Sequence, residues 1–129
     1  MIRHEFYRCN CCGSIIYTVK GSGEKITCCG EPIEKLVANS CEDASTTTHI
    51  PMITKVGSGN LGKVRIGALP HPMDEDHYIE WIYLATANGG QEKHLKPGDD
   101  SDACFALLDD EPVAALAYCN KHGLWIKEI

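Results

Sequence analysis

Residues 77–96 read HYIEWIYLATANGGQEKHLK, a stretch that combines a strongly apolar segment, a glycine turn and a polar segment. Isoleucine, tyrosine, tryptophan and threonine favour extended strands, and an Asn-Gly pair is a strong signal for a tight turn between two antiparallel strands. The stretch therefore predicts a β-hairpin formed by residues 77–86 and 91–96.

Further segments of strand-like composition lie on either side of this hairpin. They read IPMITKV (50–56), LGKVRIGAL (61–69), ACFALL (103–108), VAALAYC (113–119) and LWIKEI (124–129). Short strands separated by turns, with little sign of a long helix, predict an all-β fold and a two-sheet β-sandwich of immunoglobulin-like type. Residues 112–119 leave an alternative open, because their alanines and leucine could equally form a helical turn.

The first part of the chain differs in composition from the rest. Six of the eight cysteines fall in the first third, where IIYTVK (15–20), a GSG turn and EKIT (24–27) predict a small hairpin. A unit of fewer than about 40 residues usually needs disulfides, a metal or oligomerisation to stay folded. We therefore predict a small metal domain at 1–37, a polar linker at 38–48 and the sandwich at 49–129.

Length and charge limit the classes of function. The chain has 129 residues and a formal net charge of −6, which argues against a general nucleic-acid binder with its basic surface. No apolar run approaches the roughly 20 residues that span a membrane. The opening residues, MIRHEFYRC, lack the apolar core of a signal peptide, so we expect a cytoplasmic protein. In that reducing compartment, many cysteines indicate metal ligation more than disulfides.

Four cysteines of the first part have the spacing of a metal site. Cys9 and Cys12 form a C-x-x-C pair, and Cys28 and Cys29 are adjacent beyond the predicted hairpin. Such pairs can close a tetrahedral all-sulfur site, and the spacing leaves iron and zinc equally open. A zinc site that only stabilises the small domain is the alternative. Cys11 is expected to be an exposed or hydrogen-bonding neighbour, whereas Cys41 and Cys104 are expected to be small buried apolar residues.

Histidines and one cysteine of the second part form another candidate site. His71 and His77 bracket the proline-opened loop LPHPMDEDH (69–77), and Cys119 and His122 lie in YCNKHGLW (118–125). His49, in STTTHIP (45–51), would be a solvated loop residue if it stood alone. Together, four imidazoles and a thiolate suit Fe(II) and leave one octahedral position open. The remaining histidines, His4 and His94, are expected to be solvated.

These motifs together resemble the desulfoferrodoxin family, the two-iron form of superoxide reductase, over essentially the whole chain. YRCNCCGS and TCCGEP resemble its desulforedoxin module, and PHPM, HYIEW, LKPGD and YCNKHGLW resemble its catalytic domain. The resemblance implies a rubredoxin-like or desulforedoxin-like N-terminal iron domain, an immunoglobulin-like sandwich and a homodimer. It also implies one-electron reduction of superoxide to hydrogen peroxide, with electrons from rubredoxin or a similar donor.

The resemblance implies a role for each candidate ligand. The ligands of the electron-transfer iron would be Cys9, Cys12, Cys28 and Cys29. The ligands of the catalytic iron would be His49, His71, His77 and His122 in the equatorial plane, with Cys119 as the axial ligand.

The chain departs from the family pattern immediately before His49. Typical members carry Glu-Lys there, and the lysine is credited with attracting superoxide, whereas this chain has Thr47 and Thr48. A threonine hydroxyl brings no charge. An electron-transfer or redox-sensing protein is therefore a rival reading, and a zinc-stabilised binding module is a weaker one. The sequence offers three lysines as a replacement cation, which are Lys20, Lys55 and Lys121.

Overall fold

The computed structural model describes residues 5–40 and 49–129, and the chain divides into two compact units, Met1–Val37 and Ala38–Ile129. His4, Cys41, Thr47 and Thr48 lie outside the described residues, so our expectations for them stay predictions. The predicted linker and domain boundaries also stay predictions. Asn39 belongs to the second unit, where its backbone pairs with that of Trp125 in an isolated parallel bridge.

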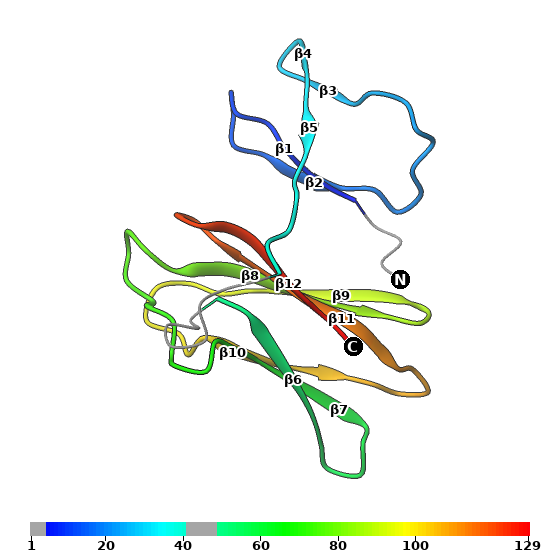
Figure 1. The fold of residues 1–129 in the computed structure, drawn as a ribbon, viewed down its shortest axis with the longest axis vertical. Helices are drawn as coiled ribbons and strands as arrows, with labels where there is room; N and C mark the ends of the chain where they lie inside the picture. Colours follow the sequence, from blue (N-terminus) through cyan, green and yellow to red (C-terminus); the bar gives the residue numbers. More distant parts are fainter. Residues whose placement is uncertain (1–4, 41–48) are drawn as a thin grey trace. The chain divides into compact units, whose positions relative to one another are not determined.

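The first unit consists of very short strands (Figure 1). They are β1 (Phe6–Arg8), β2 (Ile15–Tyr17), β3 (Thr27–Cys28), β4 (Glu31–Pro32) and β5 (Glu34–Lys35). The order β2-β1-β5 makes one sheet, and β3 pairs with β4. The predicted hairpin between 15–20 and 24–27 is therefore wrong. Residues 15–17 pair with β1 instead, where the Tyr17 ring contacts Phe6 at 5.7 Å and Phe6 is buried.

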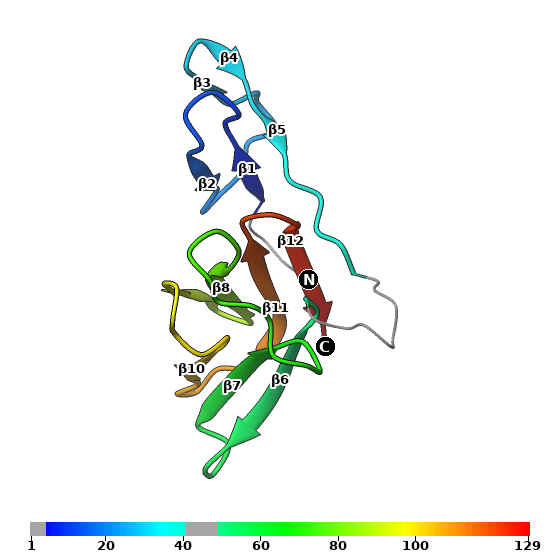
Figure 2. The same cartoon turned by 90° about the vertical axis from the view of Figure 1, so that its left-hand side faces the viewer.

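The second unit is a two-sheet sandwich, which confirms the predicted all-β, immunoglobulin-like fold. Its strands are β6 (Pro51–Val56), β7 (Leu61–Ile66), β8 (Ile79–Thr86), β9 (Gly89–His94), β10 (Asp102–Ala106), β11 (Pro112–Cys119) and β12 (Gly123–Glu128). One sheet has the order β10-β7-β6 and the other β12-β11-β8-β9. Figure 2 shows the sheet with β6 and β7 beside the one with β11 and β12.

The two sheets enclose one apolar core. β7 and β10 contribute Val64, Ile66 and Phe105 from one sheet, and β8 contributes Ile82 and Leu84 from the other. Alternate residues of β7 are buried, as expected of a strand with one face on the core and one in water. Residues 112–119 form a strand and not a helical turn, and their small alanines pack against the large side chains opposite.

The exposure of Cys104 differs from our expectation. We expected a buried residue, but the side chain is exposed on β10. The strand period of two explains the difference, because Phe105 points into the core and its neighbour must point outward.

Shortening Ile82 should measure how tightly this core is packed. Ile82 is fully buried, so we expect Ile82→Val to lower the free energy of unfolding by about 0.5–1.5 kcal/mol. Leu108 is 82% exposed, and Leu108→Ala should change stability by less than about 0.5 kcal/mol. Urea unfolding followed by far-UV circular dichroism measures both. Equal effects of the two substitutions would contradict the packing described here.

No helix within residues 5–40 and 49–129 has the length and apolar character that a membrane span requires.

Candidate metal centres

The structure brings the five predicted donors of the second unit together at one end of the sandwich. His49 precedes β6, His71 and His77 lie between β7 and β8, Cys119 ends β11, and His122 lies in the turn before β12. One ligand atom from each lies within 4.8 Å of the others. Residues from three loops and a strand end therefore converge as the sequence predicted.

Two of these histidines have ring nitrogens that need a partner. The Nδ1 atom of His71 lies 2.7 Å from the Pro72 carbonyl oxygen, so it carries the proton and donates it. This fixes the tautomer and leaves Nε2 with a free lone pair. Within residues 5–40 and 49–129, the buried Nε2 atoms of His71 and His77 have no hydrogen-bond partner. A buried nitrogen lone pair without a donor is costly, and a metal ion in the shared space would satisfy both.

The other two histidines, His49 and His122, have ring nitrogens that lie close together in the same space. The Nε2 atom of His49 lies 3.1 Å from Nδ1 of His122, and Cys119 Sγ lies 3.6 Å from that same Nδ1. Two nitrogens bonded at about 2.1 Å to one ion, at right angles, would lie about 3 Å apart. The donor set is therefore three Nε2 atoms, one Nδ1 atom and one sulfur, and it fits a single ion.

The protein environment keeps the imidazoles in the form that binds metals. Burial lowers the pKa of His71 to about 4, so its ring is neutral at physiological pH. Burial also lowers the pKa of His77, and the nearby charges of His122 and Lys121 act in the same direction. Neutral imidazole is the ligand form, so little proton release is needed at these two positions.

Access from solvent exists on one side of the site. Cys119, His49 and His71 are buried, whereas His122 is exposed. A small molecule can therefore reach the ligand cluster at the edge formed by the β11–β12 turn.

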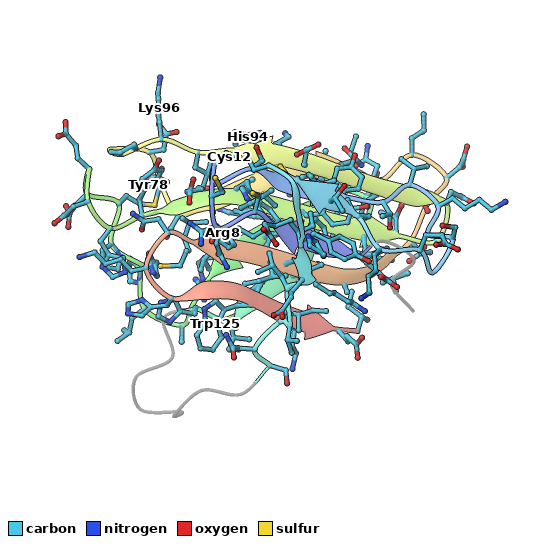
Figure 3. All side chains as sticks on the ribbon, turned by 90° about the horizontal axis from the view of Figure 1, so that it is seen from above. Arg8, Cys12, Tyr78, His94, Lys96 and Trp125 are labelled. Carbon is cyan, nitrogen blue, oxygen red and sulfur yellow. The ribbon has the colours of Figure 1, made fainter. Side chains whose placement is uncertain are left out.

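Trp125 supports two of the candidate ligands. Its indole ring stacks on the His49 ring at 4.6 Å and 13°, and its Nε1–H donates to the His122 carbonyl oxygen at 3.1 Å. Figure 3 shows this side chain near the start of β12. The motif YCNKHGLW contains Trp125, but no pattern in the sequence indicates that its ring contacts His49.

Two substitutions should separate the stacking contact from the hydrogen bond. Trp125→Phe keeps an aromatic face on His49 and removes the donor, whereas Trp125→Ala removes both. We expect Trp125→Ala to weaken Fe(II) binding in the second unit by about 10-fold, and Trp125→Phe to weaken it less. Anaerobic competition with a chromophoric chelator measures both. Unchanged affinity in the Ala variant would contradict a supporting role.

The first unit brings together the four predicted cysteines. Ligand atoms of Cys9, Cys12, Cys28 and Cys29 lie within 4.8 Å of one another. The Sγ atoms of Cys12 and Cys28 are 3.7 Å apart, and tetrahedral bonds of about 2.3 Å would place two sulfurs about 3.8 Å apart. The four-cysteine group therefore has the dimensions of a closed tetrahedral site.

Turns of the backbone present these sulfurs. The Gly13 N–H donates to the Cys9 carbonyl oxygen at 2.8 Å, and the Cys9 N–H donates to that of Ser14 at 2.9 Å. Gly13 has φ +78°, a conformation that glycine adopts without strain. Cys29 itself has φ 54°, which is uncommon for a residue with a Cβ atom.

The thiols differ in acidity before a metal binds. Hydrogen bonds from Ser14 lower the pKa of Cys12 to about 6. Hydrogen bonding with Cys9 raises the pKa of Cys28 to about 11, and hydrogen bonding with Cys11 raises that of Cys29 to about 12. Cys12 is therefore already a thiolate when a metal binds, whereas the metal must displace protons from Cys28 and Cys29.

The remaining candidates belong to neither group of ligands, although Cys11 hydrogen-bonds with Cys29. Cys11 is exposed, as expected. His94 is also exposed, with 73% of its side chain accessible and an ion pair to Glu92. Lys55 forms an ion pair with Glu111 at 2.6 Å, and the charge of Lys121 acts on His77. Lys20 belongs to the first unit, so its role stays a prediction.

Comparison with known proteins identifies the family. The desulfoferrodoxin family profile matches residues 41–128, and that of the desulfoferrodoxin N-terminal domain matches residues 2–36. A desulfoferrodoxin of Syntrophotalea carbinolica is 40% identical over 124 residues, covering 96% of this chain and 95% of that protein. A desulfoferrodoxin of Nitratidesulfovibrio vulgaris is 40% identical over 126 residues, covering 98% and 97%.

A solved structure agrees with these sequence matches. The superoxide reductase from Treponema pallidum superposes with a TM-score of 0.80 at 27% identity, covering 98% of each chain. The four-cysteine group and the group of four histidines and one cysteine match the iron sites of the desulfoferrodoxin family, which confirms iron as the predicted cofactor. Zinc in the four-cysteine group stays a possibility from the sequence. The chain belongs to the desulfoferrodoxin family.

Proposed function

We propose that this protein is a superoxide reductase, which converts superoxide to hydrogen peroxide at an iron held by the second unit. Its ligands would be His49, His71, His77, His122 and Cys119. The observation that carries the proposal is the convergence of these five donors on one space, with two buried ring nitrogens that have no hydrogen-bond partner among the described residues.

Bound ferrous iron would supply one electron and an open coordination position, and superoxide with that electron and two protons gives hydrogen peroxide. The side chains of this unit set the conditions for that reaction. Neutral imidazoles and one thiolate leave a local charge of about +1 with a divalent ion, which attracts an anion despite the overall charge of −6. The exposed edge at His122 admits a small anion and water.

Cys119 has a separate role in this proposal. Its sulfur is fully buried at the end of β11, where a thiolate needs a cation to offset the loss of hydration. A thiolate ligand donates electron density to its metal and favours transfer of an electron to the substrate. The buried sulfur would therefore serve as the permanent electron-donating ligand, while the exposed edge lies at His122.

We propose that the first unit is an electron-transfer site, with iron held by Cys9, Cys12, Cys28 and Cys29. Four sulfurs at tetrahedral spacing undergo little change of geometry on oxidation, which suits repeated one-electron transfer. Rubredoxin or a similar protein is the proposed donor, the homodimer is the proposed assembly, and the cytoplasm is the proposed location. The number of cysteines used as thiolates supports a reducing compartment.

Metal analysis combined with rapid kinetics tests the proposal. We expect two irons per chain, and fast oxidation of the reduced second-unit iron when superoxide is generated by pulse radiolysis, with hydrogen peroxide as product. Zinc in both sites, or iron that does not react with superoxide, would overturn the proposal. Peroxide formation with no dioxygen from the same superoxide distinguishes reduction from dismutation.

Thr47 and Thr48 favour a second candidate, an electron-transfer or redox-sensing protein that keeps both iron sites and reacts poorly with superoxide. Reversible reduction of both irons with slow superoxide oxidation would select it.

The two threonines also imply a weak dependence on salt. Because no lysine directly precedes His49, we expect the rate of superoxide capture to fall less steeply with ionic strength than in a relative with Glu-Lys there. Pulse radiolysis from low to high salt measures the slope. A steep fall would show that another cation serves the site, and Lys121→Gln should then flatten it.

A further inference from the structure

Asn120 lies between two proposed ligands and contacts the loop that carries a third. It follows Cys119 at the end of β11, and its side chain is exposed. Its hydrogen bonds within the described part of the chain go to Asp76 and Tyr78, the two neighbours of His77. These contacts join the β11–β12 turn to the loop before β8.

Three hydrogen bonds make this connection. The Asn120 backbone N–H donates to the Tyr78 carbonyl oxygen at 3.2 Å, and the Tyr78 N–H donates to Asn120 Oδ1 at 2.9 Å. Asn120 Nδ2 donates to the Asp76 carbonyl oxygen at 3.0 Å. Figure 3 shows Tyr78 at the loop end of the second unit. The side-chain amide thus pairs with a backbone N–H and a backbone carbonyl on either side of His77.

The strand ladder is irregular where it approaches the candidate site. β11 and β8 pair from Ala114 and Ala85 to Tyr118 and Trp81, and after a register shift Cys119 pairs with Ile79. Such an irregularity disrupts the ladder locally, and beyond it the Asn120 N–H still donates to the Tyr78 carbonyl oxygen. An asparagine side chain carries the same donor and acceptor as a peptide group, so it can extend the pairing by one more step.

The loop that carries His77 is held together by backbone hydrogen bonds of its own. The N–H groups of Asp74 and His77 each donate to the other's carbonyl oxygen, at 2.9 Å and 3.1 Å. This tight turn fixes the backbone of His77 within the loop. The hydrogen bonds of Asn120 add to the Cys119–Ile79 strand pair in relating this loop to Cys119 and His122.

We infer that Asn120 is a positioning residue that sets the place of His77 relative to Cys119 and His122 in the metal site. The inference rests on the proposed function only in taking these three residues as ligands. Metal bonds tolerate errors of about 0.2 Å, so a small shift of the loop would weaken the site. Residues that orient ligands typically change metal affinity by about 10–100-fold when they are replaced.

The test compares Asn120→Ala with a matched control, Asn88→Ala. Asn88 is also exposed and joins two loops of the same unit, through hydrogen bonds to Asp110, which belongs to neither proposed metal site. We expect Asn120→Ala to weaken Fe(II) binding in the second unit by about 10–100-fold and to shift the thiolate-to-iron absorption band. Asn88→Ala should do neither. The iron of the first unit serves as an internal reference and should bind equally in all variants.

Asn120→Asp refines the test. It keeps the acceptor for the Tyr78 N–H and loses the donor to Asp76, so its loss of affinity should be smaller than that of Asn120→Ala. It also takes the place of Asn120→Ala if that variant fails to fold, as judged by far-UV circular dichroism. Parent-like affinity and an unshifted band in the folded variant would overturn the inference.

Neither measurement uses superoxide. Loss of iron affinity in a protein that is inert to superoxide would therefore support the role of Asn120 and reject the proposed reaction. Normal affinity in a protein that reduces superoxide would do the reverse.

Discussion

Replacing Cys119 by serine should abolish the thiolate-to-iron absorption band and weaken iron binding in the second unit by more than about 100-fold. Cys119 is fully buried, and its Sγ lies 3.6 Å from Nδ1 of His122. A serine hydroxyl in the same place stays protonated near neutral pH and donates little electron density. The proposed reaction with superoxide should slow in parallel, because the donor ligand is lost while the histidines remain.

The chain offers a control for this substitution. Cys104→Ser changes the same atom on an exposed position of β10, outside the metal groups, and should leave the band, the iron content and the superoxide reaction unchanged. Absorption spectra of the ferric protein and iron analysis after gel filtration measure the outcome. Retention of the band in Cys119→Ser would show that another sulfur is the ligand.

Replacing Cys12 by serine should remove iron from the first unit and unfold that unit. Cys12 and Cys28 have sulfurs 3.7 Å apart, and the unit has only short strands and few buried side chains. Below about 40 residues, a metal commonly supplies the free energy of folding. We therefore expect one iron per chain, with loss of the all-sulfur absorption and of proteolytic resistance in this unit.

Cys11→Ser is the matched control for Cys12→Ser. The two residues are adjacent and both exposed, but only Cys12 belongs to the four-cysteine group. Cys11→Ser should keep two irons per chain, and both variants should keep the absorption of the second unit. Loss of iron in Cys11→Ser and retention in Cys12→Ser would show that the ligand assignment is reversed. Loss of both irons in Cys12→Ser would show that the second site depends on the first.

Some features of the fold follow from local sequence alone. Alternation of apolar and polar residues along 61–66, and the glycine turn after 77–86, are short-range patterns that the structure reproduces as β7 and the β8–β9 hairpin. The first unit shows the limit of such patterns. Residues 15–17 have strand character, but their partner is β1, where Tyr17 contacts the buried Phe6, and not the segment that follows the glycine turn.

The candidate ligands also differ in how far local sequence patterns predict them. Cys9, Cys12, Cys28 and Cys29 were predictable from spacing, because a C-x-x-C turn and an adjacent pair bring sulfurs together locally. His49 and His122 are 73 positions apart, and their prediction as ligands required the combined motifs and the family resemblance. Residues that support the ligands, such as Trp125 and Asn120, carried no signal of their own.

The sequence by itself determined the chemistry of this protein, which is four thiolates in one unit and four imidazoles with a thiolate in the other. Residue types limit the metals that can bind, and they can be read from the sequence without coordinates. The tertiary structure decided which nitrogen of each ring faces the shared space, which side is open and what holds His77 in place. Those features depend on strand register and on contacts between loops distant in sequence, because sheet packing and not local propensity places the loops next to one another.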